Sequence, residues 1–293
     1  MSMTLLRTLI AVADTSSFAA AAGRVHISQA AVGQQMRKLE ADLGVTLFDR
    51  MGRSPRLTDL GEAVATRARE VIHSYDGLLN GLIADAELMG ELTVGAIPSQ
   101  IRALLPLSIK RLLARYPGLH TRVVSGLNEE LQEAVERGNQ DAAILSRPAH
   151  LPHGLTFEPF AEEAYVLITG ADVSGDDPRE ILSREPYIRH QRRAVAGQLA
   201  DSWLTEQGIS VQPTMELQSL EALANMVAHG LGVSVVPDPC VPDETFADLR
   251  RIPLPGKAPV RTLGILTRAD CPKRALVDAL AEEIRATTTN SKS

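Results

Sequence analysis

Side chains suited to reading DNA bases lie at helical spacing after Ser28. One side of the helix that Ser28 would begin carries small, amide and basic residues, namely Gln29, Ala30, Gly33, Gln34, Arg37 and Lys38. The opposite side is mostly apolar. A glutamine amide can pair with adenine, and an arginine guanidinium with guanine or with phosphate. The pattern predicts a helix in a DNA major groove, although a solvated surface helix is the commoner origin of such a polar face.

A second basic group follows in a segment rich in turn-forming residues. Residues 45–48 and 57–58 have the composition of short strands, and glycine and proline shape the connection between them. That connection contains three arginines, which are Arg50, Arg53 and Arg56. Guanidinium groups clustered on a turn can follow phosphates or enter the minor groove. The segment is typical of a wing, a β-hairpin beside a DNA-reading helix.

Three short helices are expected to position these groups. Apolar residues at helical spacing predict a helix over 4–13. Ser16 and Ser17 offer an N-cap for a helix over 18–22, and Ser28 caps the DNA-reading helix over 29–43. Two short helices joined by a brief turn, the second with a polar face, have helix-turn-helix geometry.

Residues 16–62 resemble the winged helix-turn-helix of the LysR-type transcriptional regulators. The similarity runs without gaps through SSFAAAAGRVHISQAAVGQQMRKLEADLGVTLFDRMGRSPRLTDLGE. It implies a DNA-binding domain over 1–58, with double-stranded DNA as partner. The implied DNA-binding residues are Ser28, Gln29, Ala30, Gly33, Gln34, Arg37, Arg50, Arg53 and Arg56. The family usually has proline and serine at the positions of Ala30 and Gly33, and position 34 is often basic, so base preference is not carried over there. Gly33 either permits close approach to DNA or loses a contact.

A long amphipathic helix is expected next, over 59–89. Thr58 can cap it, and Asp59 and Glu62 lie in its first turn, where acidic groups are favoured. Its apolar stripe consists of Val64, Ala68, Val71, Tyr75, Leu78, Leu82, Ala86 and Met89. The stripe either packs on the same chain or joins two chains. We favour a homodimer, because a two-fold pair of DNA-binding domains matches an inverted-repeat operator. In the LysR-type family this segment resembles the dimerising linker helix, and assembly to a homotetramer is also expected.

Residues 90–293 alternate between strands and helices, which is typical of an α/β fold. The expected strands are 92–97, 120–124, 141–145, 165–168, 214–217, 233–236 and 262–267. The expected helices lie within 98–113, 129–137, 198–207, 219–229 and 272–286. The first three strands with their helices make a βαβαβ pattern and predict a parallel sheet. We assign about 90–161 and 266–293 to one lobe and about 162–265 to a second, as in a hinged receptor that closes on a ligand.

This region also resembles the effector-binding domain of the same family, which is similar to a periplasmic binding protein. Similarity covers essentially the whole chain and is strongest over 4–72 and 216–238. It implies a small-molecule effector between the lobes, near strand ends and helix N-termini. The candidate effector-binding residues are Ser99, Gln100, Ser146, Arg147, Arg189, Gln191, Gln218 and Ser219. Such groups favour a small carboxylate or similar anion. Ser219 is equally well a plain N-cap, and Arg147 could instead pair with a surface acid.

Catalytic and cofactor motifs are missing from the sequence. It has no Gly-rich phosphate loop, no His-x-x-x-His pair and no nucleophile elbow. We therefore expect no enzyme activity, no cofactor and no metal. The two cysteines, Cys240 and Cys271, exclude a disulfide scaffold. Some relatives sense peroxide with cysteines, but these positions do not match that subgroup, and we interpret both as ordinary thiols.

Two other classes of protein are the alternatives. An α/β enzyme whose N-terminal helices serve only assembly would need a catalytic constellation. A small-molecule transport protein would need a secretion signal and no winged helix. The sequence offers neither a catalytic constellation nor a secretion signal, and it does contain the pattern of a winged helix.

The net charge of −6 would, taken alone, argue against a nucleic-acid partner. Its distribution changes that conclusion. Residues 1–60 hold seven Lys+Arg and five Asp+Glu, a net charge of +2, which leaves −8 for the rest. No apolar run approaches the ~18 residues of a membrane span, so we expect a cytoplasmic protein with no membrane partner. RNA polymerase is an expected partner if the protein activates transcription.

Overall fold

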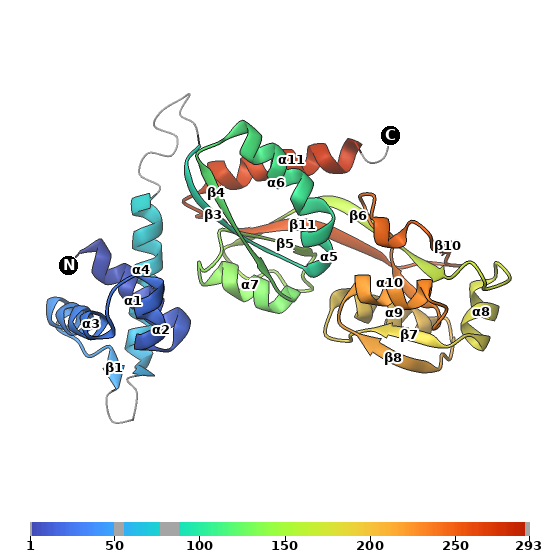
Figure 1. The fold of residues 1–293 in the computed structure, drawn as a ribbon, viewed down its shortest axis with the longest axis horizontal. Coiled ribbons are helices and arrows are strands. Elements are labelled where there is room, and N and C mark those ends of the chain that lie inside the picture. Colours follow the sequence, from blue (N-terminus) through green and yellow to red (C-terminus); the bar gives the residue numbers. More distant parts are fainter. Residues whose placement is uncertain (1, 50–55, 77–87, 291–293) are drawn as a thin grey trace. The chain divides into compact units, whose positions relative to one another are not determined.

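The computed structural model describes residues 2–49, 56–76 and 88–290 (Figure 1). Residues 1–86 form one unit, and nearly all of residues 87–293 form the other. None of the helices in the described ranges has the length and apolar character needed to cross a membrane.

The first unit is a helical domain with a short hairpin. Its elements are α1 (Met3–Thr15), α2 (Phe18–Arg24), α3 (Gln29–Leu43), β1 (Phe48–Asp49), β2 (Arg56–Leu57) and α4 (Asp59–Asp76). Ser17 and Ser28 cap α2 and α3 by accepting bonds from backbone N–H groups, and Gly44 ends α3 in the left-handed conformation. The expected helix-turn-helix and the two antiparallel strands of the wing are present, while residues 50–55 at the wing tip lie outside the described residues.

The polar face of α3 is fixed by what its other face buries. Val32, Met36 and Leu39 are fully buried in the core of this unit. One carboxylate oxygen of Glu40 accepts bonds from the N–H groups of Leu47 and Phe48, at 2.9 and 3.2 Å. These bonds attach the start of the wing to α3, so the position of the hairpin is tied to that of the helix.

The α4 helix only partly follows the expected linker. Val64 and Ala68 pack into the core of their own unit, whereas Val71 and Tyr75 are 40% and 51% exposed. Of the expected stripe, Leu78, Leu82 and Ala86 lie outside the described residues. Residues 88–89 are not helical, because β3 begins directly after them, so the expected helix end at 89 is wrong.

The second unit is a two-lobed α/β domain. Its strands are β3 (Gly90–Ala96), β4 (Leu119–Ser125), β5 (Ala142–Ser146), β6 (Leu155–Thr169), β7 (Tyr187–His190), β8 (Pro213–Leu217), β9 (Ser234–Pro237), β10 (Arg250–Pro253) and β11 (Val260–Arg268). Its helices are α5 (Pro98–Arg102), α6 (Leu104–Arg115), α7 (Asn128–Glu136), α8 (Pro178–Arg184), α9 (Val195–Glu206), α10 (Leu220–Ala228), η1 (Glu244–Phe246, 3-10) and α11 (Arg274–Asn290).

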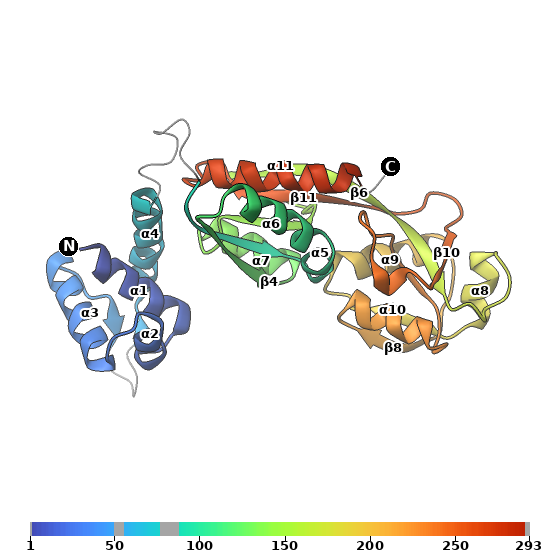
Figure 2. The same ribbon diagram turned by 45° about the horizontal axis from the view of Figure 1, so that its top comes forward.

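In the first lobe, β3 pairs in parallel with β4 and β5, as the βαβαβ pattern predicts. The sheet then continues through β11 and β6, which are antiparallel additions. Helices α6 and α11 lie side by side over one face, and α7 covers the other (Figure 2). In the second lobe, β9 and β10 flank the end of β6, and β7 pairs with β8. Helix α9 packs on one side of these strands and α10 on the other.

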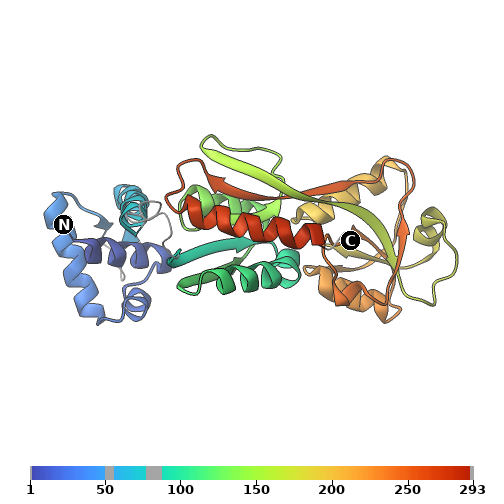
Figure 3. The same cartoon turned by 90° about the horizontal axis from the view of Figure 1, so that it is seen from above.

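Two long strands connect the lobes (Figure 3). The first part of β6 pairs with β11 over residues 155–164, and its last residues pair with β9 and β10. Because β11 is one continuous strand from Val260, residues 260–265 belong to the first lobe, so the chain returns near 260 and not at the expected 265. The start of β6 and all of α8, β7 and β10 were not expected.

Candidate effector cleft and DNA-reading helix

The outer face of α3 carries the predicted DNA-contacting groups. Its exposed members are Ser28, Gln29, Ala30, Gln34 and Arg37. Gly33 is half-buried, and a Cβ added there would meet only Phe18 Cε2, at 4.0 Å. Packing within the protein therefore does not require glycine at this position. On the wing, Arg56 is exposed on β2 opposite Asp49, while Arg50 and Arg53 lie outside the described residues.

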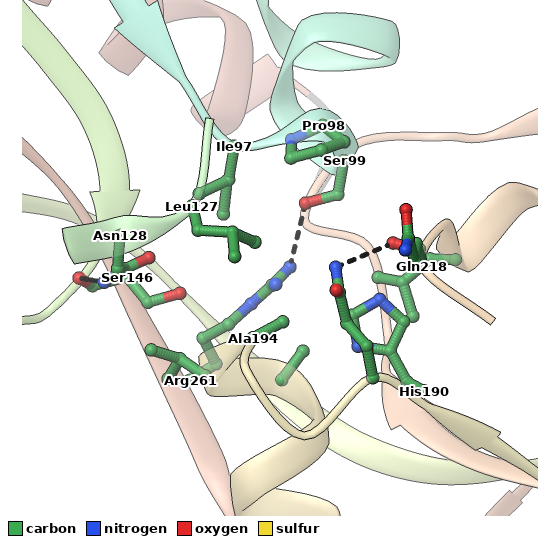
Figure 4. A pocket seen from close by; sticks show the side chains of 14 residues that line it. Ile97, Pro98, Ser99, Leu127, Asn128, Ser146, His190, Ala194, Gln218 and Arg261 are labelled. Carbon is green, nitrogen blue, oxygen red and sulfur yellow. Dashed lines mark hydrogen bonds between the residues drawn. The ribbon is translucent and has the colours of Figure 1, made fainter. Parts of the chain in front are cut away.

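A cavity lies between the two lobes of the second unit, with about 410 Å³ of empty space when the open solvent at its mouth is included (Figure 4). Four of the eight candidate effector residues line it: Ser99, Ser146, Gln191 and Gln218. They come from α5, the end of β5, and the loops after β7 and β8. These four candidates, from both lobes, span 119 positions of the chain.

The other four candidates lie outside this cavity. Gln100 is 3% exposed and donates to a Glu163 carboxylate oxygen at 3.4 Å. The exposed Arg147 guanidinium stacks on the Phe157 ring, 4.8 Å from its centroid.

Arg189 donates to Asp201 at 3.0 Å, and Ser219 caps α10 through the Ala222 N–H, at 3.2 Å. Each of the four adjoins a residue that does line the cavity, and adjacent side chains on an extended or helical chain point in different directions. Of each of the candidate pairs 99 and 100, 146 and 147, 189 and 191, and 218 and 219, one residue lines the cavity and the other does not.

One wall of the cavity is formed by Arg261, which belongs to a buried ion pair. Arg261 of β11 and Glu163 of β6 are cross-strand partners, 4% and 2% exposed. The guanidinium donates through Nε and Nη2 to one carboxylate oxygen of Glu163, with Nε at 2.9 Å. Burial opposes the charge of Arg261, but the Glu163 carboxylate outweighs it, and the pKa of Arg261 is raised. Nη2 also reaches the Ser99 hydroxyl oxygen at 3.4 Å, so the guanidinium extends into the cavity.

His190, at the end of β7, forms another wall and is 7% exposed. Burial first, and then the positive charge of Arg261, lower the pKa of His190 to about 4, against a hydrogen bond to the Gln218 backbone that raises it. The imidazole is therefore neutral near pH 7.

The low pKa of His190 predicts acid sensitivity. An unfolded histidine, with a pKa near 6.5, takes up its proton before the folded one does, so the free energy of unfolding should fall by up to about 3 kcal/mol from pH 6.5 to pH 4. Chemical denaturation across this range measures the slope. The His190→Asn variant should show a flatter slope, and equal slopes in both proteins would contradict the assignment.

The first turn of α9 faces the same cavity. Its N-cap residue, Ala194, has no side-chain acceptor, and Ala194, Val195 and Ala196 all line the cavity. The N–H groups at the start of a helix need partners and carry partial positive charge. Gly197 makes this approach possible, because a Cβ there would lie 2.3 Å from the Gln191 carbonyl oxygen.

Three parts of the cleft, Arg261, His190 and the start of α9, were not predicted from the sequence. His190 stands between the candidates Arg189 and Gln191, and this position was the available signal. Arg261 has no local signal, because its partner Glu163 is 98 residues away.

Neither cysteine has the environment of a reactive thiol. Both are free, Cys271 is buried and Cys240 is partly buried. Burial, with the negative charge of Glu163 nearby, raises the pKa of Cys240 to about 12. In the described ranges, no three His, Cys, Asp or Glu residues group closely enough to hold a metal ion.

Two family models match the chain. The bacterial regulatory helix-turn-helix protein, lysR family, matches residues 3–62, and the LysR substrate binding domain matches residues 85–289. The DNA-binding transcriptional dual regulator OxyR of Escherichia coli K12 is 30% identical over 287 residues, covering 96% of this chain and 94% of its own. The transcriptional activator IlvY of Salmonella typhimurium is 29% identical, covering 80% of this chain and 81% of its own.

Solved structures of full-length regulators are similar as well. A full-length OxyR variant from Pseudomonas aeruginosa has a TM-score of 0.73 and 27% identity, and the match covers 98% of this chain and 95% of that one. CbnR complexed with its target DNA has a TM-score of 0.62 and 22% identity, a likeness of fold alone, covering 98% and 100%. With both halves matched in one order, the chain belongs to the LysR family of DNA-binding transcriptional regulators.

Proposed function

We propose that this regulator binds an inverted-repeat operator as a dimer and that a small carboxylate or similar anion, held between the lobes, changes that binding. The observation that carries the anion proposal is the joint presence of Arg261 and the uncapped start of α9 on one cavity. A carboxylate there would accept bonds from both.

The protein's own groups occupy only part of the Arg261 guanidinium. One carboxylate oxygen of Glu163 accepts from the Nε side of the guanidinium. The other oxygen accepts from the Cys240 N–H at 3.0 Å and from Gln100. The guanidinium edge near Ser99 remains directed at the cavity (Figure 4). An anion would meet arginine donors without displacing the ion pair.

The assembly we propose rests on α4. Val71 and Tyr75 are exposed apolar side chains on a helix whose preceding turns pack on their own unit. A second copy of the chain would cover them, which supports a homodimer through the linker and, with further contacts, a homotetramer. The proposed setting is the cytoplasm, with RNA polymerase as a partner if the protein activates. No enzymatic role is proposed.

The DNA-binding assignment is tested by comparing two variants in gel shifts on DNA upstream of the gene. Arg56→Ala removes a phosphate contact, so we expect similarly weaker binding to all sequences and a salt dependence shallower by about one unit of slope. Gln29→Ala removes a base contact, so we expect a loss of discrimination between operator and mutated operator of about 1–3 kcal/mol. Identical behaviour of the two variants would refute the roles of wing and helix.

The same gel shifts, repeated with small carboxylates and matched cations, test the effector. A change in mobility or footprint with carboxylates alone is the expected result. Exclusive response to cations would overturn the anion proposal, and no shift even at low salt would overturn the operator proposal.

Several relatives are named hydrogen peroxide-inducible genes activators, among them one from Escherichia coli O157:H7 at 30% identity. For this chain we propose that cysteine oxidation is not the signal, since the thiolate is the reactive form and the pKa of Cys240 is about 12. Treatment with micromolar peroxide should leave both thiols free in a thiol titration. Rapid loss of two thiols, reversed by a reductant, would contradict this.

A further inference from the structure

We propose that the effector is a hydroxycarboxylate, whose hydroxyl group donates a hydrogen bond to the His190 imidazole while its carboxylate lies at Arg261 and the start of α9. This hydroxyl specificity rests on the proposed anion site and narrows the class of ligand that the site selects.

His190 is the buried polar group of the cleft that the protein leaves unsatisfied. Its Nδ1 has no hydrogen-bond partner among the described residues, although the side chain is only 7% exposed and lines the cavity. A buried polar atom without a partner costs about 1–3 kcal/mol. A ligand group that bonds to it would recover this cost, which makes the atom a strong selector.

The imidazole presents an acceptor to the ligand. A neutral imidazole has one N–H, and the Gln218 backbone offers that proton an acceptor. With the proton used there, the other ring nitrogen has only its lone pair. The ligand must therefore bring a donor, and a carboxylate alone has none.

Several other polar groups in the cleft already have protein partners. Asn128 donates through Nδ2 to the Ser146 carbonyl oxygen at 2.6 Å, and Gln191 donates through Nε2 to the Gln218 carbonyl oxygen at 3.2 Å. Ser99 accepts from Arg261. Of these groups, the imidazole is the one with a buried atom, Nδ1, that lacks a hydrogen-bond partner among the described residues.

The acceptor and the anion site are close to each other. The charge of Arg261 is the second cause of the lowered pKa of His190, and both side chains line the same small cavity (Figure 4). The hydroxyl therefore belongs on a carbon near the carboxylate, as in a 2-hydroxy or 3-hydroxy acid. The lining of the cavity also contains the apolar side chains of Ile97, Leu127 and Leu220, which suit a short alkyl or an aryl substituent on the ligand.

The test measures binding of matched acids to the full chain by calorimetry. The pairs are lactate with propionate, 3-hydroxybutyrate with butyrate, and mandelate with phenylacetate. We expect at least one hydroxy acid to bind 10-fold or more tighter than its partner, because a site that hydrogen-bonds a hydroxyl disfavours an analogue without it.

Three variants connect that preference to the imidazole. His190→Phe should abolish the preference, whereas His190→Asn, which keeps an acceptor near Nδ1, should retain part of it. His153→Asn, at an exposed position, is the control and should bind as the wild type does.

The outcomes separate the two proposals. Equal binding within every pair, or a preference that survives in His190→Phe, overturns the hydroxyl inference and leaves the anion proposal standing. If no acid of either kind binds, the anion proposal fails and the hydroxyl inference falls with it.

Discussion

Replacing Arg261 with methionine should lower the free energy of unfolding by about 3–5 kcal/mol. The guanidinium is 4% exposed, and its removal leaves the Glu163 carboxylate, 2% exposed, buried without its countercharge. Breaking a buried pair costs far more than removing an exposed one for this reason. Urea denaturation monitored by circular dichroism measures the loss, and carboxylate binding should disappear in the same variant.

Two further variants make the Arg261 result interpretable. Arg261→Met combined with Glu163→Gln removes both charges and keeps an oxygen for the Cys240 N–H, so most of the stability should return while carboxylate binding stays lost. Arg192→Met, which removes an ion pair of a 66% exposed arginine with Asp201, should cost under about 1 kcal/mol. A loss at Arg261 as small as that at Arg192 would show that the buried pair is not structural.

Gly197→Ala should reduce effector binding at least 10-fold without any change in a polar group. A Cβ at this position would lie 2.3 Å from the Gln191 carbonyl oxygen and 2.7 Å from that of His190. Since backbone atoms cannot yield as a flexible side chain can, α9 must move away from the loop after β7, and the cavity wall with it. We also expect a stability loss of about 1–3 kcal/mol, as for other overpacked sites.

The matched control is Gly23→Ala. Gly23 lies in α2, and an added Cβ would meet no atom within 4 Å. Alanine should stabilise this helix by up to about 1 kcal/mol and leave effector binding unchanged. Unaltered binding in Gly197→Ala would contradict the close-approach role of that glycine.

The sequence predicted most where local rules decide. Ser28 and Gly44 bound α3, and buried Val32 and Met36 fix its outer face, all within a short stretch of chain. The start of α8 also has a local signal, Asp177 as N-cap before a proline.

Pairings between strands that are distant in the chain could not be predicted from the sequence. The length of β6 depends on β11, whose residues lie far along the chain, and short β7 is recognisable only once β8 and Val233 lie beside it. The loops named from the sequence do line the cavity, but the choice between neighbours such as Arg189 and His190 depends on the direction of each side chain.

The position of Arg261 and Glu163 on the two crossing strands has a consequence for signalling. They are paired one residue before β6 leaves β11 for the second lobe, so the proposed anion-binding group lies on the two strands that connect the lobes. Ligand binding and the angle between the lobes then depend on the same pair of strands. By thermodynamic linkage, a change in either one alters the other. A substitution that stiffens the crossing, even at a residue far from the ligand, changes how tightly the ligand is held.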